Sequence, residues 1–375
     1  MDFALSARQR DRRAEILAAA HPPNESPSCF DRAGWLRAAA LGLTGACLPA
    51  EHGGGGLGAL DTALELEAYT MGGADTGLAF AVAAHLLACG VPVREHAGAQ
   101  VRGELLRGLA AGDLIAANAM TEDGAGSDTG ALATRARRDG EVYVLDGEKS
   151  FVSNAPVAGV FVTYAVTDPA AGFLGITAFA VPHDLPGVAV GPALPKMGLD
   201  GCHAARVRFT GCRVPARYRL GAEGSGAAVF RRSMAWERAC LPAIYLGVME
   251  RQLDRCVGHA GRRRQFGRNI GGFQAVSHRL AGMKLRLESA RLLLYRACWQ
   301  LDQASEAAGR AAALAKVAVS EAAVANALDA VQLFGAAGYL RDGGIEEHLR
   351  DAVPSTIFSG TTDMQKELIA RGLGL

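Results

Sequence analysis

The sequence has 375 residues, enough for two or three structural units that each bury a core of their own. Half of the residues are hydrophobic and 21% are charged, which is ordinary for a soluble globular protein. The formal net charge of +1 gives no reason to expect a nucleic acid or a membrane surface as a partner.

The eight cysteines are scattered, with no CxxC pair and no histidine spacing suited to a metal, so they predict free thiols, no disulfides and no metal site. The N-terminus mixes four arginines with acidic residues, and no apolar core follows, which argues against a transit or signal peptide. The most apolar run, residues 77–93, contains His85 and is short for a membrane span, so it predicts a buried helix. We therefore expect a cytoplasmic protein.

Three regions with different residue patterns follow one another along the chain. Residues 1–115 are rich in Ala and Leu at helical spacing, broken by a glycine-rich turn at 49–58. Residues 116–222 show the alternation and the β-branched runs of strands between Gly, Pro and Asp turns. Residues 223–375 return to the helical period. The pattern predicts an α+β protein, mostly α, with a helical domain, a middle β domain and a second helical region at these bounds.

In one predicted helix of the last region, the spacing of the apolar residues indicates how the helix packs. Its apolar residues recur at alternating intervals of three and four, which keeps one stripe facing a partner helix over about eight turns, as in helix bundles. The stretches 230–257 and 314–334 are long and apolar enough to be its neighbours. The residues of the stripe are Phe273, Val276, Leu280, Met283, Leu287, Ala290, Leu294, Ala297 and Leu301.

Two motifs of the β region are candidates for a ligand site. Residues 120–128, MTEDGAGSD, combine closely spaced glycines with hydroxyl groups, a set that can bind a pyrophosphate or form a plain turn. Residues 147–154, GEKSFVSN, end a strand with Phe151 and Ser153 on the same side. That pair can stack on a flat heterocycle and bond to it, or the aromatic ring can belong to a β core.

Two further motifs lie in the C-terminal region. The run Arg262-Arg-Arg-Gln-Phe-Gly267 ends a helix, where arginines usually complement the helix dipole but can also bind phosphate. Polar residues around 332–335, 350–351 and 359–363 follow the last long helix, where they line a site or cap a helix end.

Taken in order, the motifs of this chain resemble those of the acyl-CoA dehydrogenase family. The resemblance covers nearly the whole chain. It implies an N-terminal helical domain, a middle β-barrel-like domain and a C-terminal four-helix bundle, in a homodimer or homotetramer whose FAD reaches across a subunit interface. The segments that carry it are PAEHGGGGLG, TEDGAGSD, GEKSFVSN, MGLDG, RRQFGRNIGGFQ, DAVQLFGAAGY and RDAVPSTIFSGTT.

The resemblance implies a set of FAD contacts. At the flavin and the pyrophosphate we expect Met120, Thr121, Ser127, Phe151 and Ser153, the last two in place of the usual Trp-x-Thr. Toward the FAD of a neighbouring subunit we expect Arg263, Gln265, Phe266 and Gln332 with the backbone of Gly335 and Ala336. At the adenine end we expect Thr361 and Asp363, where Asp363 replaces the usual Gln.

The family reaction needs a carboxylate base, because the α-proton of an acyl thioester is only weakly acidic. Most members carry this base in the tail as Glu-Gly-Thr, but here the tail has Ser359 at that position. Some relatives, including isovaleryl- and long-chain acyl-CoA dehydrogenases, carry it on the first bundle helix in a Glu-Arg pair. This chain has Glu237-Arg238, 26 residues before Arg263, so the resemblance assigns the base to Glu237. An ordinary surface ion pair is the alternative meaning of Glu-Arg.

The resemblance also implies substrate contacts and partners. Arg238 and Trp236 are expected at the substrate, and the backbone N–H of Ser359 at the thioester oxygen. The acyl group is expected on an acyl carrier protein or on coenzyme A. The carrier protein is favoured over coenzyme A, because the segment WERAC is similar to bacterial acyl-carrier-protein dehydrogenases of polyketide extender-unit pathways. The expected electron acceptor is another flavoprotein.

Two other functions remain compatible with the sequence. An oxygen-using oxidase or monooxygenase on the same fold would not need a base at Glu237 and would reoxidise rapidly in air. A non-catalytic flavin-binding protein is favoured by the absent tail carboxylate and disfavoured by Glu237 and by the intact cofactor motifs. Fold similarity alone does not decide among them.

Overall fold

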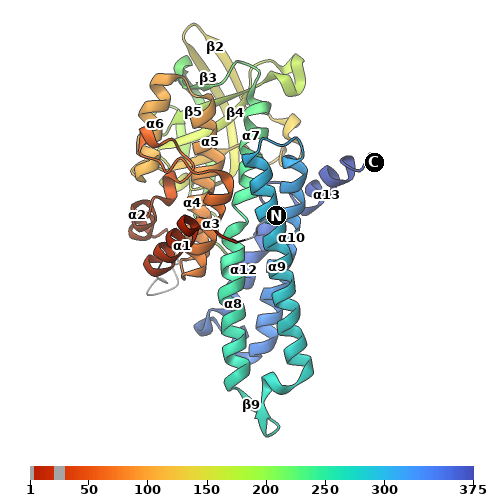
Figure 1. The fold of residues 1–375 in the computed structure, drawn as a ribbon. Coiled ribbons are helices and arrows are strands. Elements are labelled where there is room, and N and C mark those ends of the chain that lie inside the picture. The colour runs from red at the N-terminus through yellow and green to blue at the C-terminus, as the bar shows by residue number, and fades with distance from the viewer. Residues whose placement is uncertain (1–3, 21–29) are drawn as a thin grey trace.

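A computed structural model describes residues 4–20 and 30–375 of the chain. Helices of the N-terminal part and a sheet form one end of the molecule, and a long helical bundle extends away from them (Figure 1). This confirms the predicted fold class. Seven of the cysteines are free and buried, as predicted, whereas Cys29 lies outside the described residues.

The N-terminal part consists of short helices that pack around one apolar segment. This segment, Thr76–His96, is helical throughout and contains a π-helical stretch at His85–Gly90. It is long and apolar enough to cross a membrane, but 94% of its apolar window is buried inside the protein, as predicted for a core helix. The helices are α1 (Ala7–Ala19), α2 (Arg32–Ala40), α3 (Ala59–Met71), α4 (Thr76–Ala84), α5 (Val91–His96) and α6 (Ala99–Ala111).

The middle part is an eight-stranded sheet with the order β6-β7-β3-β2-β4-β5-β8, and β1 pairs with β4 in parallel. One face encloses a core of its own that includes Tyr143, Phe161, Phe179 and Phe209. The other face packs on the helices. The strands are β1 (Ala116–Ala119), β2 (Arg135–Asp139), β3 (Val142–Ser153), β4 (Val160–Val166), β5 (Ile176–Pro182), β6 (Val188–Val190), β7 (Ala204–Pro215) and β8 (Arg219–Leu220).

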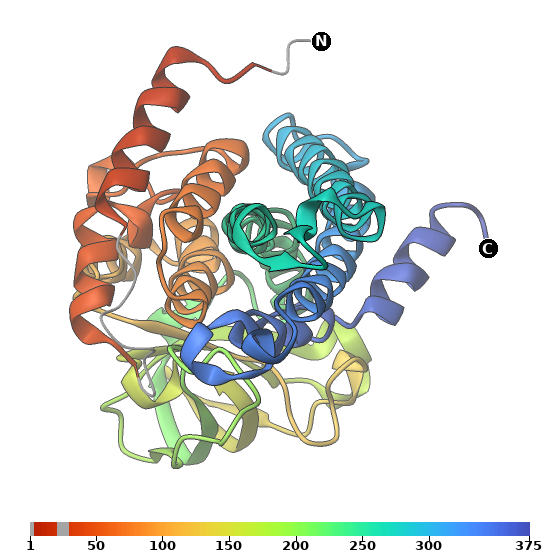
Figure 2. The ribbon, with the colours of Figure 1, turned by 90° about the horizontal axis from the view of Figure 1, so that it is seen from below.

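The C-terminal part contains the long helices of the bundle (Figures 1 and 2). The predicted stripe lies on α9, where Met283, Leu287, Ala290 and Leu294 are buried. The helices are α7 (Gly226–Cys240), α8 (Ala243–Arg262), α9 (Gln274–Asp302), α10 (Ala308–Phe334), α11 (Ala336–Tyr339), α12 (Ile345–Ala352) and α13 (Thr362–Arg371). A hairpin of β9 (Arg264–Gln265) and β10 (Arg268–Asn269) joins α8 to α9.

The stretch 230–257, expected to be one helix, is two. Helix α7 ends at Cys240 and α8 begins at Ala243, with Pro242 between them. Proline has no N–H to continue the helical ladder, and its ring clashes with the preceding turn. The apolar pattern continues through the break, so spacing alone did not reveal it.

Helix α3 fixes the N-terminal part to the bundle at close range. A Cβ added at Gly247 of α8 would lie 2.2 Å from the carbonyl oxygen of Glu67 in α3, so the two backbones touch. The Glu67 carboxylate accepts hydrogen bonds from Arg291 at 3.0 Å and Tyr295 at 2.7 Å, both on α9. Helix α7, which carries the candidate base, begins directly after the last strand of the sheet and leads to α8, the helix that contacts α3.

Candidate active site

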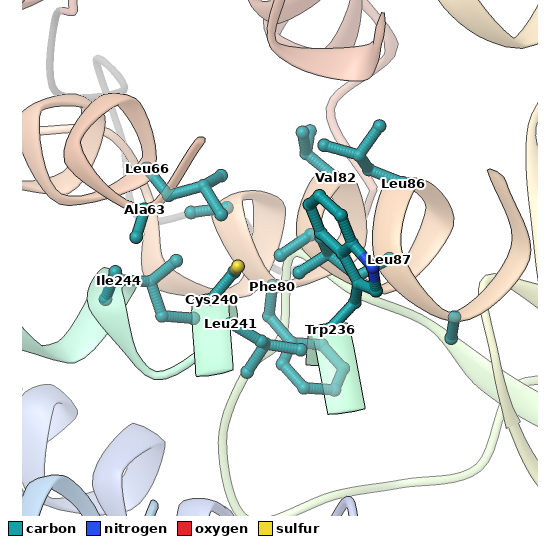
Figure 3. Packing of buried hydrophobic residues seen from close by; sticks show 14 of the residues in the cluster. Ala63, Leu66, Phe80, Val82, Leu86, Leu87, Trp236, Cys240, Leu241 and Ile244 are labelled. Carbon is teal, nitrogen blue, oxygen red and sulfur yellow. The ribbon is translucent and has the colours of Figure 1, made fainter. Parts of the chain in front are cut away.

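Glu237 lies in the last turn of α7, and only 7% of its surface is exposed. The residues next to Glu237 in the chain pack against apolar side chains. Figure 3 shows the Trp236 side chain beside Val82, Leu86 and Leu87 of the Thr76–His96 segment, with Leu241 close to Phe80. A surface ion pair, the alternative meaning of Glu-Arg, is therefore not what this carboxylate forms.

The two carboxylate oxygens of Glu237 have different surroundings. Oε1 accepts a hydrogen bond from the hydroxyl of Ser359. Oε2 is buried and has no hydrogen-bond partner among the described residues. Burial raises the pKa of Glu237 above its usual value, and the Ser359 hydroxyl and the charge of Arg238 offset part of that rise. One oxygen is thus held, and the other is free to accept a proton.

Ser359 sits in a turn that the surrounding side chains fix. Its backbone is left-handed, with φ 56°, and Gly360 follows with φ 90°. The Ser359 carbonyl accepts a hydrogen bond from Nε of Arg238 at 2.8 Å and one from Nε2 of Gln365 at 3.2 Å. The φ of Gly360 is one that residues with a side chain rarely adopt, and a Cβ there would also lie 2.6 Å from the Gln365 amide, so glycine is strongly favoured.

The residues expected at the substrate differ in their contacts. Arg238 bonds to the carbonyl of Ser359, so in this structure it holds the tail against α7. The Trp236 indole has the guanidinium of Arg94 over its ring, 4.6 Å from the centroid. Its Nε1 is buried without a partner in the described part of the chain. The substrate contacts of both residues stay predictions.

The first group of expected FAD residues gathers where β1 and β3 end. Ser150 donates its backbone N–H to the carbonyl of Thr121 at 2.8 Å. The buried Lys149 donates to the carbonyl of Met120 at 3.1 Å and to the carboxylate of Glu122 at 2.7 Å. These bonds bring Met120 and Thr121 alongside the strand end that carries Phe151 and Ser153.

This strand end fits a flat, phosphate-bearing cofactor. Phe151 has a left-handed backbone, with φ 56°, and 62% of it is exposed. A left-handed backbone costs free energy at an aromatic residue. Because the ring is exposed, packing within one chain offsets little of this cost. In the adjoining loop, Thr121 and Ser127 make no side-chain hydrogen bond to the described residues, and Gly124 and Gly126 face open space. The ring of Phe151 and these hydroxyls are available to a flavin and its pyrophosphate.

The second group of expected FAD residues lies at the opposite end of the bundle. Arg263, Gln265 and Phe266 are at the β9–β10 hairpin, at the tip farthest from the sheet (Figure 1). Phe266 also has a left-handed backbone, with φ 50°, and is 91% exposed. A stack of His259 on Phe334, with ring centroids 4.2 Å apart, joins α8 to the end of α10. This brings Gln332, Gly335 and Ala336 to the same end of the bundle.

The third group lies beside Ser359. Thr361 caps α13 by accepting the backbone N–H of Met364 at 3.3 Å, and Asp363 follows in the first turn. A single chain therefore brings Glu237, Ser359, Thr361 and Asp363 together but leaves the hairpin group apart from the Met120 group.

Sequence reasoning missed two residues of this region. Gln365 holds the turn at Ser359, and Tyr164 of β4 places a buried, unpartnered hydroxyl on the sheet face toward the helices. No spacing pattern pointed to either residue. Among the described residues, no group of three or more His, Cys, Asp or Glu could hold a metal ion.

Comparison with known proteins identifies similar chains over the full length. Models of the N-terminal, middle and C-terminal domains of acyl-CoA dehydrogenase match residues 10–113, 117–212 and 224–374. An L-prolyl-[peptidyl-carrier protein] dehydrogenase of Pseudomonas fluorescens is 51% identical, over 96% of this chain and 95% of its own. One from a Serratia species is 45% identical, over 91% and 88%.

Two solved structures are similar throughout. The structure of PigA with FAD and proline has a TM-score of 0.97 at 42% identity and covers 100% of both chains. The prolyl acyl carrier protein oxidase AnaB has a TM-score of 0.96 at 37% identity, over 99% of this chain and 100% of its own.

Proposed function

The chain belongs to the acyl-CoA dehydrogenase family and is an FAD-dependent dehydrogenase of acyl thioesters, and we propose that its acyl group is L-proline bound to a carrier protein. Two relatives at 51% and 45% identity act on L-prolyl groups held on peptidyl-carrier proteins. The observation that carries the chemistry is Glu237, a buried carboxylate with one oxygen held and the other free.

Glu237 takes the α-proton of the acyl group through its free oxygen, Oε2. Because burial raises the pKa of this carboxylate, it holds the proton better than an exposed glutamate would. The hydroxyl of Ser359 keeps the other oxygen in place, so the carboxylate does not rotate away from the substrate. The backbone N–H of Ser359 donates to the thioester oxygen and stabilises the negative charge that develops there.

When bound, FAD supplies the two-electron oxidation, and this chain supplies its site. The side chains of Met120, Thr121, Phe151 and Ser153 would hold the flavin, Ser127 the pyrophosphate, and Thr361 and Asp363 the adenine end.

The hairpin group completes the FAD site of a second copy in a homodimer or homotetramer. The group is Arg263, Gln265 and Phe266 with Gln332, Gly335 and Ala336. Its distance from the Met120 group within one chain supports this assignment (Figure 1). The outer side of α9 exposes Leu285, Leu292 and Trp299, which are spaced by seven residues and form one apolar stripe. Such a stripe suits contact with another copy.

The reaction takes place in the cytoplasm, and an electron-accepting flavoprotein reoxidises the enzyme. Oxidation by molecular oxygen is a second candidate, because the similar structure AnaB is a prolyl acyl carrier protein oxidase. Mixing the reduced enzyme with air separates the two. Reoxidation within seconds favours an oxidase, and slow reoxidation that a carrier flavoprotein accelerates favours a dehydrogenase.

The substrate proposal is tested by anaerobic titration of the FAD-loaded protein. We expect L-prolyl thioester on a carrier protein to bleach the flavin absorbance faster than butyryl-coenzyme A or a butyryl group on the same carrier protein. Faster bleaching by butyryl-coenzyme A would contradict both the prolyl group and the carrier. Faster bleaching by the butyryl carrier protein would contradict the prolyl group alone.

A further inference from the structure

The sheet face toward α7 carries two polar side chains that the reaction described above does not use. They are Tyr164 on β4 and Asn118 on β1. The strands pair in parallel with Asn118 opposite Val162, and Val162 and Tyr164 both belong to the core that the sheet shares with the helices. Side chains alternate along a strand, so Asn118 and Tyr164 are diagonal neighbours on this face.

Both side chains are incompletely satisfied. Tyr164 is fully buried, and no hydrogen bond of regular geometry reaches its hydroxyl from the described part of the chain, where the Ser233 hydroxyl is a polar neighbour. The Oδ1 atom of Asn118 is likewise buried without a partner there. Buried polar atoms are nearly always paired in folded proteins, so two unpaired ones side by side mark a place where a ligand supplies the missing bonds.

Tyr164 packs against the face of α7 that carries the candidate base. Its ring contacts Phe230 of α7 in an edge-on arrangement, with centroids 5.4 Å apart. Phe230, Ser233 and Glu237 are spaced by three and four residues and therefore share one face of α7. Burial raises the pKa of Tyr164, the nearby Ser233 hydroxyl lowers it, and the charge of Glu237 raises it further. The phenol is therefore protonated at neutral pH and within electrostatic reach of Glu237.

We infer that the hydroxyl of Tyr164 binds the ring nitrogen of the acyl group and so selects an α-amino acyl thioester over a hydrocarbon one. This inference rests on the proposed prolyl substrate. In a prolyl thioester the nitrogen is bonded to the carbon that Glu237 deprotonates, so whatever binds it must lie beside the base. A phenol donates and accepts hydrogen bonds and pairs with either an amine or an ammonium group. Asn118 Oδ1 is placed to accept from the same nitrogen.

The test compares two acyl groups of equal shape on the same carrier protein. One is L-prolyl, and the other is cyclopentanecarbonyl, in which a CH₂ group replaces the ring NH. A site built to pair with an NH group rejects the analogue that lacks it, because its own polar atom is left unpaired. We expect the wild-type protein to show a kcat/KM at least tenfold higher for the prolyl group.

Tyr164→Phe removes only the hydroxyl and leaves the ring packed on Phe230. We expect this variant to lose at least tenfold in kcat/KM for the prolyl group and less than threefold for cyclopentanecarbonyl. In a Glu237→Gln background, where turnover is blocked, calorimetry is expected to show at least tenfold weaker binding of the prolyl carrier protein after Tyr164→Phe. Tyr143→Phe is the matched control, because its hydroxyl accepts from Arg219 at 3.0 Å and its ring lies in the core on the other face of the sheet.

The outcomes separate the inference from the function on which it rests. Equal losses for both acyl groups, or no loss for either, would overturn the role of Tyr164 while leaving the prolyl substrate intact. If the wild-type protein oxidises other acyl thioesters but not the prolyl one, the proposed function fails first and the inference falls with it.

Discussion

At the scale of single residues, the proposed chemistry depends on the hydrogen bond between Ser359 and Glu237. This chain places a hydroxyl in the tail that bonds to a carboxylate on α7. In the proposed mechanism the tail orients the base and does not carry it. The sequence indicated both positions, but it did not predict the bond between them, because their proximity depends on the turn fixed by Arg238 and Gln365.

Ser359→Ala tests this bond through pH dependence. The hydroxyl lowers the pKa of Glu237, so its removal raises that pKa. The base must be deprotonated to act, so the acidic limb of the kcat/KM profile moves to higher pH and the loss of rate is greater at pH 6 than at pH 9. Ser355→Ala is the control, because its hydroxyl lies in the same tail without a partner among the described residues. An unchanged acidic limb in Ser359→Ala would show that the bond does not tune the base.

At the scale of elements, the regular spacing of apolar residues predicted a helix and its buried face correctly, whereas the points where elements are interrupted were not predicted. The stripe on α9 was predicted because one face stays apolar over the whole helix, and the burial of Met283, Leu287 and Leu294 confirms it. The break at Pro242 was missed because apolar residues continue on both sides of it. The left-handed backbone of Phe151 was also beyond prediction, because it follows from the bonds that hold the strand end to the 120–121 segment.

The contact of α3 with α8 predicts a large effect of one methyl group. Gly247→Ala places a Cβ against the backbone of Glu67, so the helices must separate, and we expect a loss of about 2–3 kcal/mol in the free energy of unfolding. Gly261→Ala on the same helix meets open space and is expected to stabilise by roughly 0.5–1 kcal/mol, since alanine favours helix over glycine. Denaturant unfolding of both variants checks this. Equal stability of the two would mean that the helices are not in contact at Gly247.

At the scale of the whole molecule, the proposed FAD contacts fall at two places that one chain keeps apart, the sheet and the β9–β10 hairpin (Figure 1). Phe151 and Phe266 are both exposed and both have a left-handed backbone, one at the sheet and the other at the hairpin. Within the chain the Phe266 ring has an edge-on contact with Phe273, with centroids 6.1 Å apart, and most of its surface stays exposed. In the oligomer that we propose, the hairpin of one copy meets the sheet of another and both rings contact the cofactor.

Leu285→Glu tests the oligomer and the cofactor together. A charge in the apolar stripe of α9 is costly to bury between subunits, so we expect light scattering to show smaller particles and FAD affinity to fall at least tenfold. Leu174→Glu is the matched control, because this leucine is also exposed but lies in the turn before β5. Separation into monomers that bind FAD as tightly as the wild type would contradict a shared site.

The most direct test of the account measures flavin reduction in Glu237→Gln under anaerobic conditions. The variant keeps the shape of the side chain but cannot accept a proton, so we expect full FAD occupancy and a reduction rate by L-prolyl carrier protein lowered by about 10³-fold. Glu321→Gln, at an exposed carboxylate on α10, controls for the loss of charge and is expected to react like the wild type. Reduction of Glu237→Gln at the wild-type rate would show that another group removes the α-proton.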